Sequence, residues 1–68
     1  DRELRDSLDR HLGVLDAKYR EPLVLYFFEE LDYKEIAEVL KVPVSTVGVR
    51  IARGKAMLRD VLAQEELS

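Results

Sequence analysis

Apolar side chains recur along this chain at three- and four-residue spacing, which is the period of an amphipathic helix. The first such pattern predicts a helix over residues 2–14, and a denser apolar run predicts a second over residues 17–30. The second helix is apolar nearly all round, so we expect it at the centre of the core. Pro22 fits this helix if it begins near Tyr19 and otherwise implies a kink. The leucines of the first pattern are Leu4, Leu8, Leu12 and Leu15.

A short helix, a tight turn and a longer helix follow. Asp32 is placed to cap a helix over residues 33–40, with Glu35 three residues later as in a capping box. Pro43 ends that helix or begins the next, because proline lacks an N–H and fits the first helical turn. The last helix is expected over residues 44–63. This order is typical of a helix-turn-helix, and the whole pattern predicts an all-α fold, a small four-helix domain.

The last helix divides into two faces when its residues are advanced by about 100° each. The side expected to face the core carries Val47, Ile51, Gly54, Leu58, Val61 and Leu62. The outward side carries Ser45, Val49, Ala52, Arg53 and Ala56, flanked by Arg50, Lys55 and Arg59. Small apolar groups can meet thymine methyls in a DNA major groove, where arginine binds guanine. The alternative is an ordinary solvent-exposed helix, although such a face commonly carries more glutamate and lysine.

The net charge of −3 is distributed unevenly along the chain. Residues 1–40 carry six basic and eleven acidic side chains, whereas residues 41–59 carry five basic side chains and no acid. A basic helix on an acidic body is the asymmetry expected when one element meets phosphate. A solvated basic face is the alternative that charge alone leaves open.

Other chemistry has little support in the composition. The 68 residues make one small domain, expected to be part of a longer protein, and the absence of cysteine excludes disulfides and thiolate metal sites. A chain without cysteine fits a reducing compartment. No apolar run reaches the roughly 18 residues that span a bilayer, so no membrane insertion is expected. His11 stands alone and is expected at the surface or an edge rather than as a ligand. We expect no enzyme activity, metal or cofactor.

Two glycines in the last helix are unusual, since each costs about 1 kcal/mol relative to alanine. Gly54 lies on the core-facing side and is expected to let another helix approach. Gly48 lies at the side, where it either admits DNA backbone or is simply tolerated.

Three segments together resemble region 4 of bacterial sigma factors, nearest to the extracytoplasmic-function group. They are LDAKYREPLVLYFFEELDYKEIA at 15–37, VPVSTV at 42–47 and RIARGK at 50–55. The resemblance covers about residues 12–62. It implies a four-helix domain of a transcription initiation factor in the bacterial cytoplasm, whose last helix enters the major groove of the minus-35 promoter element. It also implies docking on the flap of the RNA polymerase beta subunit and possible cover by an anti-sigma factor.

The resemblance carries over to particular residues. Arg50 and Arg53 match basic residues of the family's recognition helix, and Thr46 matches its start, where phosphates are contacted. Arg53 is the first choice for a base contact, because both the family match and the helical periodicity place it outward. With the outward face, the expected DNA contacts are Ser45, Thr46, Val49, Arg50, Ala52, Arg53 and Lys55.

Three positions depart from the family pattern. Gly48 replaces a common cation, which removes a phosphate contact, and Val49 replaces a common serine with a methyl surface. Lys41 stands where the turn often has glycine, and a left-handed backbone there costs about 1 kcal/mol. Two alternatives remain: a LuxR-type response-regulator output domain, whose helix-turn-helix has similar segments, and a region-4-like protein-binding module that does not bind DNA.

Overall fold

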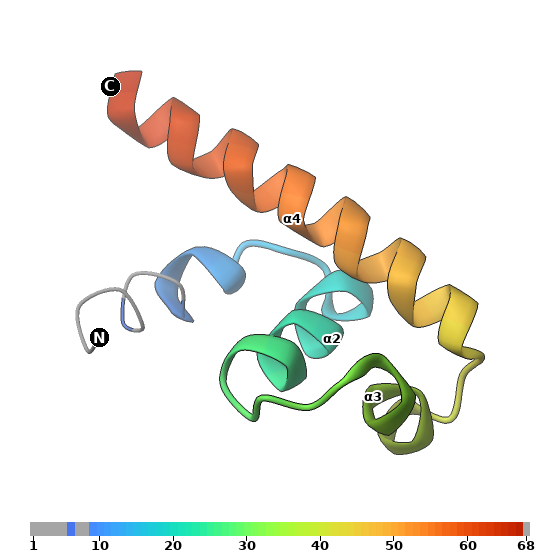
Figure 1. Cartoon of the computed structure of the whole chain (residues 1–68). Helices are drawn as coiled ribbons and strands as arrows, with labels where there is room; N and C mark the ends of the chain where they lie inside the picture. The colour runs from blue at the N-terminus through green and yellow to red at the C-terminus, as the bar shows by residue number, and fades with distance from the viewer. Residues whose placement is uncertain (1–5, 7–8, 68) are drawn as a thin grey trace.

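The computed structural model describes residue 6 and residues 9–67, the side chains of 65–67 excepted. This part of the chain contains helices and turns and no strand (Figure 1). Residues 9–12 are helical and precede three longer helices, which are α2 (Ala17–Phe27), α3 (Tyr33–Leu40) and α4 (Val44–Leu67). The prediction of an all-α, four-helix domain with a helix-turn-helix is confirmed.

The long helix α4 organises the arrangement. In Figure 1 it runs across the whole molecule, and α2 and α3 lie on the same side of it. Both α2 and α3 pack against α4 and also against each other. The helix-turn-helix is formed by α3 and the first half of α4.

Several helix ends differ from the prediction. The first helix ends at Leu12 rather than residue 14, since residues 13–14 form a turn. Its predicted portion before residue 9, which includes Leu4 and Leu8, lies outside the described residues, apart from residue 6. Helix α2 ends at Phe27 rather than residue 30, because Glu30 adopts a left-handed backbone with φ 56°. The N–H of Leu31 then donates to the carbonyl of Leu25 at 3.1 Å.

The predicted start of α2 at residue 17 is confirmed, so the helix does not begin near Tyr19. The carbonyl of Asp16 accepts hydrogen bonds from the N–H groups of Tyr19 and Arg20 at 3.0 and 2.9 Å, so the helix starts at Ala17. Pro22 is therefore the sixth residue of the helix and is buried. Its missing N–H removes one backbone hydrogen bond from the helix, and the buried ring adds apolar surface to the core.

The capping box predicted for α3 is present. The N–H of Glu35 donates to Asp32 Oδ1 at 2.8 Å, and the N–H of Asp32 donates to Glu35 Oε1 at 3.0 Å. Two otherwise unpaired donors at the helix start are thereby satisfied. This cap fixes where the helix-turn-helix begins.

The turn between α3 and α4 has the geometry that the sequence predicts. The backbone of Lys41 is left-handed, with φ 59° and ψ 47°. The N–H groups of Lys41 and Val42 both donate hydrogen bonds to the carbonyl of Ala37. The carbonyl of Pro43 accepts from the N–H groups of Thr46 and Val47 at 3.0 and 3.2 Å. Pro43 thus directly precedes α4, which runs to Leu67, four residues beyond the predicted end.

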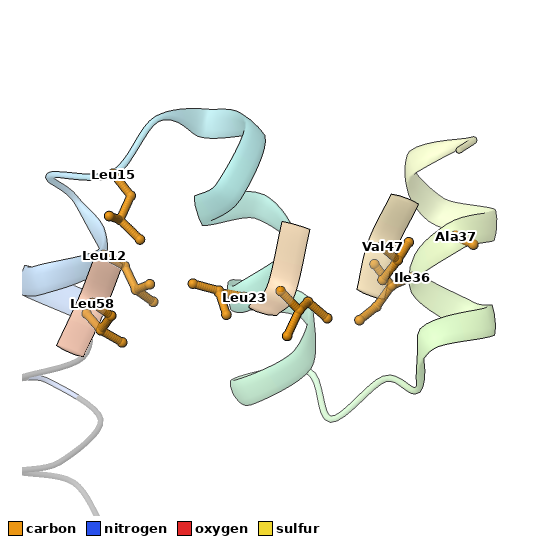
Figure 2. Close-up of a cluster of buried hydrophobic side chains, with 8 residues drawn as sticks. Leu12, Leu15, Leu23, Ile36, Ala37, Val47 and Leu58 are labelled. Carbon is orange, nitrogen blue, oxygen red and sulfur yellow. The ribbon is translucent and has the colours of Figure 1, made fainter. Parts of the chain in front are cut away.

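One hydrophobic cluster joins the elements. In Figure 2 it extends from Leu12 and Leu58 at one end, through Leu23, to Ile36 and Val47 at the other. Burying such a side chain contributes roughly 1.5–3 kcal/mol relative to its exposure in water. The buried apolar residues are Leu12, Leu15, Leu23, Ile36, Ala37, Val47, Ile51 and Leu58.

The core-facing side of α4 is confirmed for Val47, Ile51, Gly54 and Leu58, which are all buried. Leu62 was expected to face the core, but it is 36% exposed. The prediction of a surface or edge position for His11 is wrong, since only 7% of it is exposed.

Candidate nucleic-acid interface

The exposed face of α4 carries four of the seven residues predicted to contact DNA. Ser45, Val49, Ala52 and Arg53 are all exposed, Val49 to 49%. This exposure follows from the buried positions, because Val47 and Ile51 fix the opposite side of the helix in the core. The structure therefore places these four side chains together on one accessible face.

Thr46 and Arg50 lie on one flank of that face. Both are half-buried and are four residues apart, so they lie one turn apart on the same side of α4. Thr46 also stands in the first turn, where its N–H donates to the carbonyl of Pro43. At this flank the arginine adjoins exposed Arg53, three residues further on.

Lys55 differs from the other predicted contacts. It is half-buried, and its Nζ lies 4.9 Å from the ring centroid of Tyr26 and 5.9 Å from that of Phe27. Both rings belong to the end of α2, so Lys55 extends along the flank of α4 opposite Arg50. These aromatic neighbours could not be predicted from local sequence, because they are nearly thirty residues away along the chain.

Gly48 lies on the same flank as Lys55, beside α3. A Cβ added at Gly48 would lie 3.7 Å from Cε2 of Tyr33, which is ordinary van der Waals contact. The backbone at this point therefore has room for a side chain. The ring of Tyr33, 37% exposed, borders the position where the family pattern has a cation.

Charge separates the exposed face of α4 from the rest of the surface. No acidic residue occurs between Lys41 and Arg59, whereas α3 and the loop before it expose several carboxylates. These carboxylates belong to Glu29, Glu30, Asp32, Glu35 and Glu38. The first four turns of α4 are thus the part of the described surface best suited to a polyanion.

A groove of about 270 Å³ lies between α2 and α3. Its lining includes Val39, which is 56% exposed, and no residue of α4. The full lining is Arg20, Glu21, Val24, Leu25, Val39 and Leu40. This groove is mainly apolar, with one cationic and one anionic side chain at its edge.

The described residues hold no group of three or more histidine, cysteine, aspartate or glutamate side chains placed to bind a metal ion. None of the helices in this part of the chain is long and apolar enough to cross a membrane. What the described surface offers is an exposed basic helix face and a separate apolar groove.

Comparison with known families gives a match to the family described as "Sigma-70, region 4", over residues 5–58. Three curated relatives are similar to the chain. The ECF RNA polymerase sigma factor SigW of Bacillus subtilis is 42% identical over 60 residues, which is 88% of this chain and 32% of SigW. RNA polymerase sigma factor SigV of the same organism is 35% identical over all 68 residues, 39% of SigV.

The third relative is the ECF RNA polymerase sigma factor SigE of Mycolicibacterium smegmatis. It is 41% identical over 64 residues, which is 94% of this chain and 25% of SigE. The chain therefore spans between a quarter and two-fifths of the length of each of these relatives. All three are sigma factors by name.

Proposed function

Because the chain belongs to the sigma-70 region 4 family, of the extracytoplasmic-function type, we propose that it is the promoter-recognition domain of an alternative sigma factor. In this role α4 enters the major groove of the minus-35 promoter element in the bacterial cytoplasm. The observation that carries the proposal is the exposed face of the first four turns of α4, residues 44–59, which combines small side chains, arginines and no carboxylate. A major groove about 12 Å wide admits one helix of this kind.

Base readout in this proposal rests on the exposed face itself. The guanidinium of Arg53 can donate two parallel hydrogen bonds to O6 and N7 of a guanine. The methyl groups of Val49 and Ala52 can contact thymine methyls, and the hydroxyl of Ser45 can donate to or accept from a base edge. All four side chains are accessible on the same side of the helix.

Phosphate contacts come from the flanks. Thr46 and Arg50 on one flank and Lys55 on the other can contact the two DNA strands that border the groove. Such contacts set the register of the helix without reading sequence. Helix α3, residues 33–40, packs against the buried side of α4 through Ile36 and Ala37, which belong to the core.

RNA polymerase docking uses a different surface in this proposal. The apolar groove between α2 and α3 receives the flap of the beta subunit, with Val39 as the exposed apolar contact. Because no residue of α4 lines this groove, DNA and polymerase can be bound at the same time. An anti-sigma factor that covers either surface would block initiation. The domain acts by binding, without a cofactor or a chemical step.

The proposal is tested by titrating the domain with a duplex that carries a GGAAC-type element and, separately, with a scrambled duplex, while amide NMR shifts are recorded. We expect shifts concentrated between Ser45 and Arg53 that are larger with the promoter duplex and that weaken as salt increases. Arg53→Ala should cost about 1–3 kcal/mol on the promoter duplex. Arg10→Ala, an exposed arginine outside the helix-turn-helix, serves as the control and should have little effect.

Equal losses for Arg53→Ala on both duplexes would refute base readout and leave this arginine a phosphate role. The absence of shifts with either duplex would favour the protein-binding module. That alternative draws its support from the net negative charge of the chain and from Gly48, and it predicts that salt hardly affects the affinity for the partner.

A further inference from the structure

Lys55 meets the rings of Tyr26 and Phe27 where α4 passes the end of α2, and Tyr26 also contacts Tyr33 of α3. The ring of Tyr26 is the centre of this cluster: it lies edge-to-face with Phe27 at 5.2 Å and with Tyr33 at 5.8 Å between centroids. The same ring lies 4.9 Å from Nζ of Lys55. Tyr26 therefore contacts one residue from each of the two helices of the helix-turn-helix.

The aromatic contact affects what Lys55 can do. An ammonium is attracted to the face of an aromatic ring, which holds a side chain that would otherwise move freely about four bonds. The rings approach the ammonium from the α2 side, and its three donors can still reach an acceptor on the open side. A cation held in place before binding loses less conformational entropy when it meets a phosphate.

Lys55 shares its flank of α4 with exposed Arg59, one turn further on. Of the other basic residues between Val44 and Leu58, Arg50 lies on the opposite flank and Arg53 on the exposed face. At Gly48, about two turns closer to the N-terminus, the flank has no side chain.

We propose that Tyr26 is a positioning residue for DNA binding: its ring, together with that of Phe27, holds the Lys55 ammonium at the flank of α4, where it binds a backbone phosphate of one DNA strand. This inference rests on the proposed function in so far as α4 binds DNA. It adds a residue on α2, outside the recognition helix, that determines the affinity of the helix for DNA.

The test measures DNA affinity by fluorescence anisotropy at several salt concentrations between about 50 and 200 mM, with promoter and scrambled duplexes. Lys55→Met should weaken binding to both roughly five- to tenfold at about 100 mM salt and lower the salt slope by about 0.9, the effect of one phosphate contact. Tyr26→Leu should weaken binding roughly two- to tenfold. Tyr26→Phe keeps the ring and should bind like the wild type.

The matched control is Lys18→Met. Lys18 also lies over a tyrosine ring, at 5.1 Å from the centroid of Tyr19, but it belongs to the first turn of α2. Its removal changes the net charge equally and should leave the salt slope within error of the wild type. A double variant, Tyr26→Leu with Lys55→Met, should bind no more weakly than Lys55→Met alone, because both changes remove the same contact.

Two binding results would overturn the inference. If Lys55→Met behaves like Lys18→Met, the lysine only ties α4 to α2. If the losses from Tyr26→Leu and Lys55→Met add fully, the ring does not position the lysine. A phosphate contact strengthens binding to both duplexes. If the domain binds both duplexes equally and Lys55→Met still weakens binding to both, the proposed promoter recognition is refuted and the role of Lys55 is not.

A measurement without DNA keeps the inference testable if Tyr26→Leu disturbs folding. The side-chain methylene protons of Lys55 near the ring face should show upfield ring-current shifts in the wild type and in Tyr26→Phe, while Lys55 in Tyr26→Leu should lose most of them. Methylene shifts at unstructured-peptide values in the folded wild type would show that the contact does not exist in solution.

Discussion

The same substitution at two glycines of α4 should change stability in opposite directions. At Gly48, a new Cβ would lie 3.7 Å from Cε2 of Tyr33, which is a normal contact. At Gly54, it would lie 2.7 Å from Cδ1 and 3.2 Å from Cγ of Leu23. Leu23 is completely buried, so its side chain would have to shift within the core to admit the new methyl group. Gly48→Ala and Gly54→Ala therefore form a matched pair within one helix.

The magnitudes follow from two contributions. Both substitutions gain about 1 kcal/mol of helix propensity, since alanine restricts the unfolded chain and favours the helix. Only Gly54→Ala forces a methyl group into a filled core, which costs about 1–3 kcal/mol. Because the propensity gain is common to both, the difference between the two variants measures the packing cost alone. We expect Gly48→Ala to stabilise by up to about 1 kcal/mol and Gly54→Ala to be less stable than it by about 1–3 kcal/mol.

Urea unfolding followed by far-ultraviolet circular dichroism measures both free energies, with an unchanged m-value as the check that unfolding remains comparable. In a domain of this size, 1 kcal/mol corresponds to about 4–8 °C in Tm. Leu23→Val removes the atom closest to the new methyl, so Gly54→Ala should cost less in that background than in the wild type. Equal stabilisation at both glycines would refute the reasoning, because it would mean that α2 and α4 are not in close contact at Gly54.

Two further predictions concern the helix-turn-helix. Lys41→Gly should raise the free energy of unfolding by about 1 kcal/mol, because the left-handed backbone at φ 59° costs glycine nothing. If urea unfolding shows a loss of stability, the lysine side chain makes a contact that stabilises the fold by more than the backbone strain destabilises it. Gly48→Lys should tighten DNA binding and increase the salt slope by about 0.9, since it adds a cation beside the groove-facing side of α4. Gly48→Met, of similar length without the charge, is its control, and an equal gain from both would exclude a phosphate contact.

The helix-turn-helix could be read from local sequence because local interactions define it. The Asp32–Glu35 capping box and the left-handed Lys41 lie where the sequence placed them, and both depend on residues within a few positions of each other. The spacing of Val47, Ile51 and Leu58 likewise fixed which side of α4 is buried. Ser45, Val49, Ala52 and Arg53 are exposed for the same reason.

The end of α2 and the burial of His11 could not be predicted from local sequence. Helix propensity continues through Glu29 and Glu30, but the chain must turn towards α3, and Glu30 adopts a left-handed backbone to do so. His11 is polar and isolated in sequence, yet its side of the first helix is covered by the rest of the fold. Leu62 continues the apolar pattern of α4, yet it is 36% exposed.

The sequence by itself therefore determined the helices of the helix-turn-helix, the exposed face of α4 and the family, since periodicity, capping and motif order are properties of neighbouring residues. Only the tertiary structure decided that Lys55 lies over Tyr26 and Phe27 and that Gly54 faces Leu23 while Gly48 faces Tyr33. The physical reason is that a helical period assigns a side chain to one side of its own helix. Which side chains of another helix meet it there depends on how the helices cross, and that is set by the packing of the whole core.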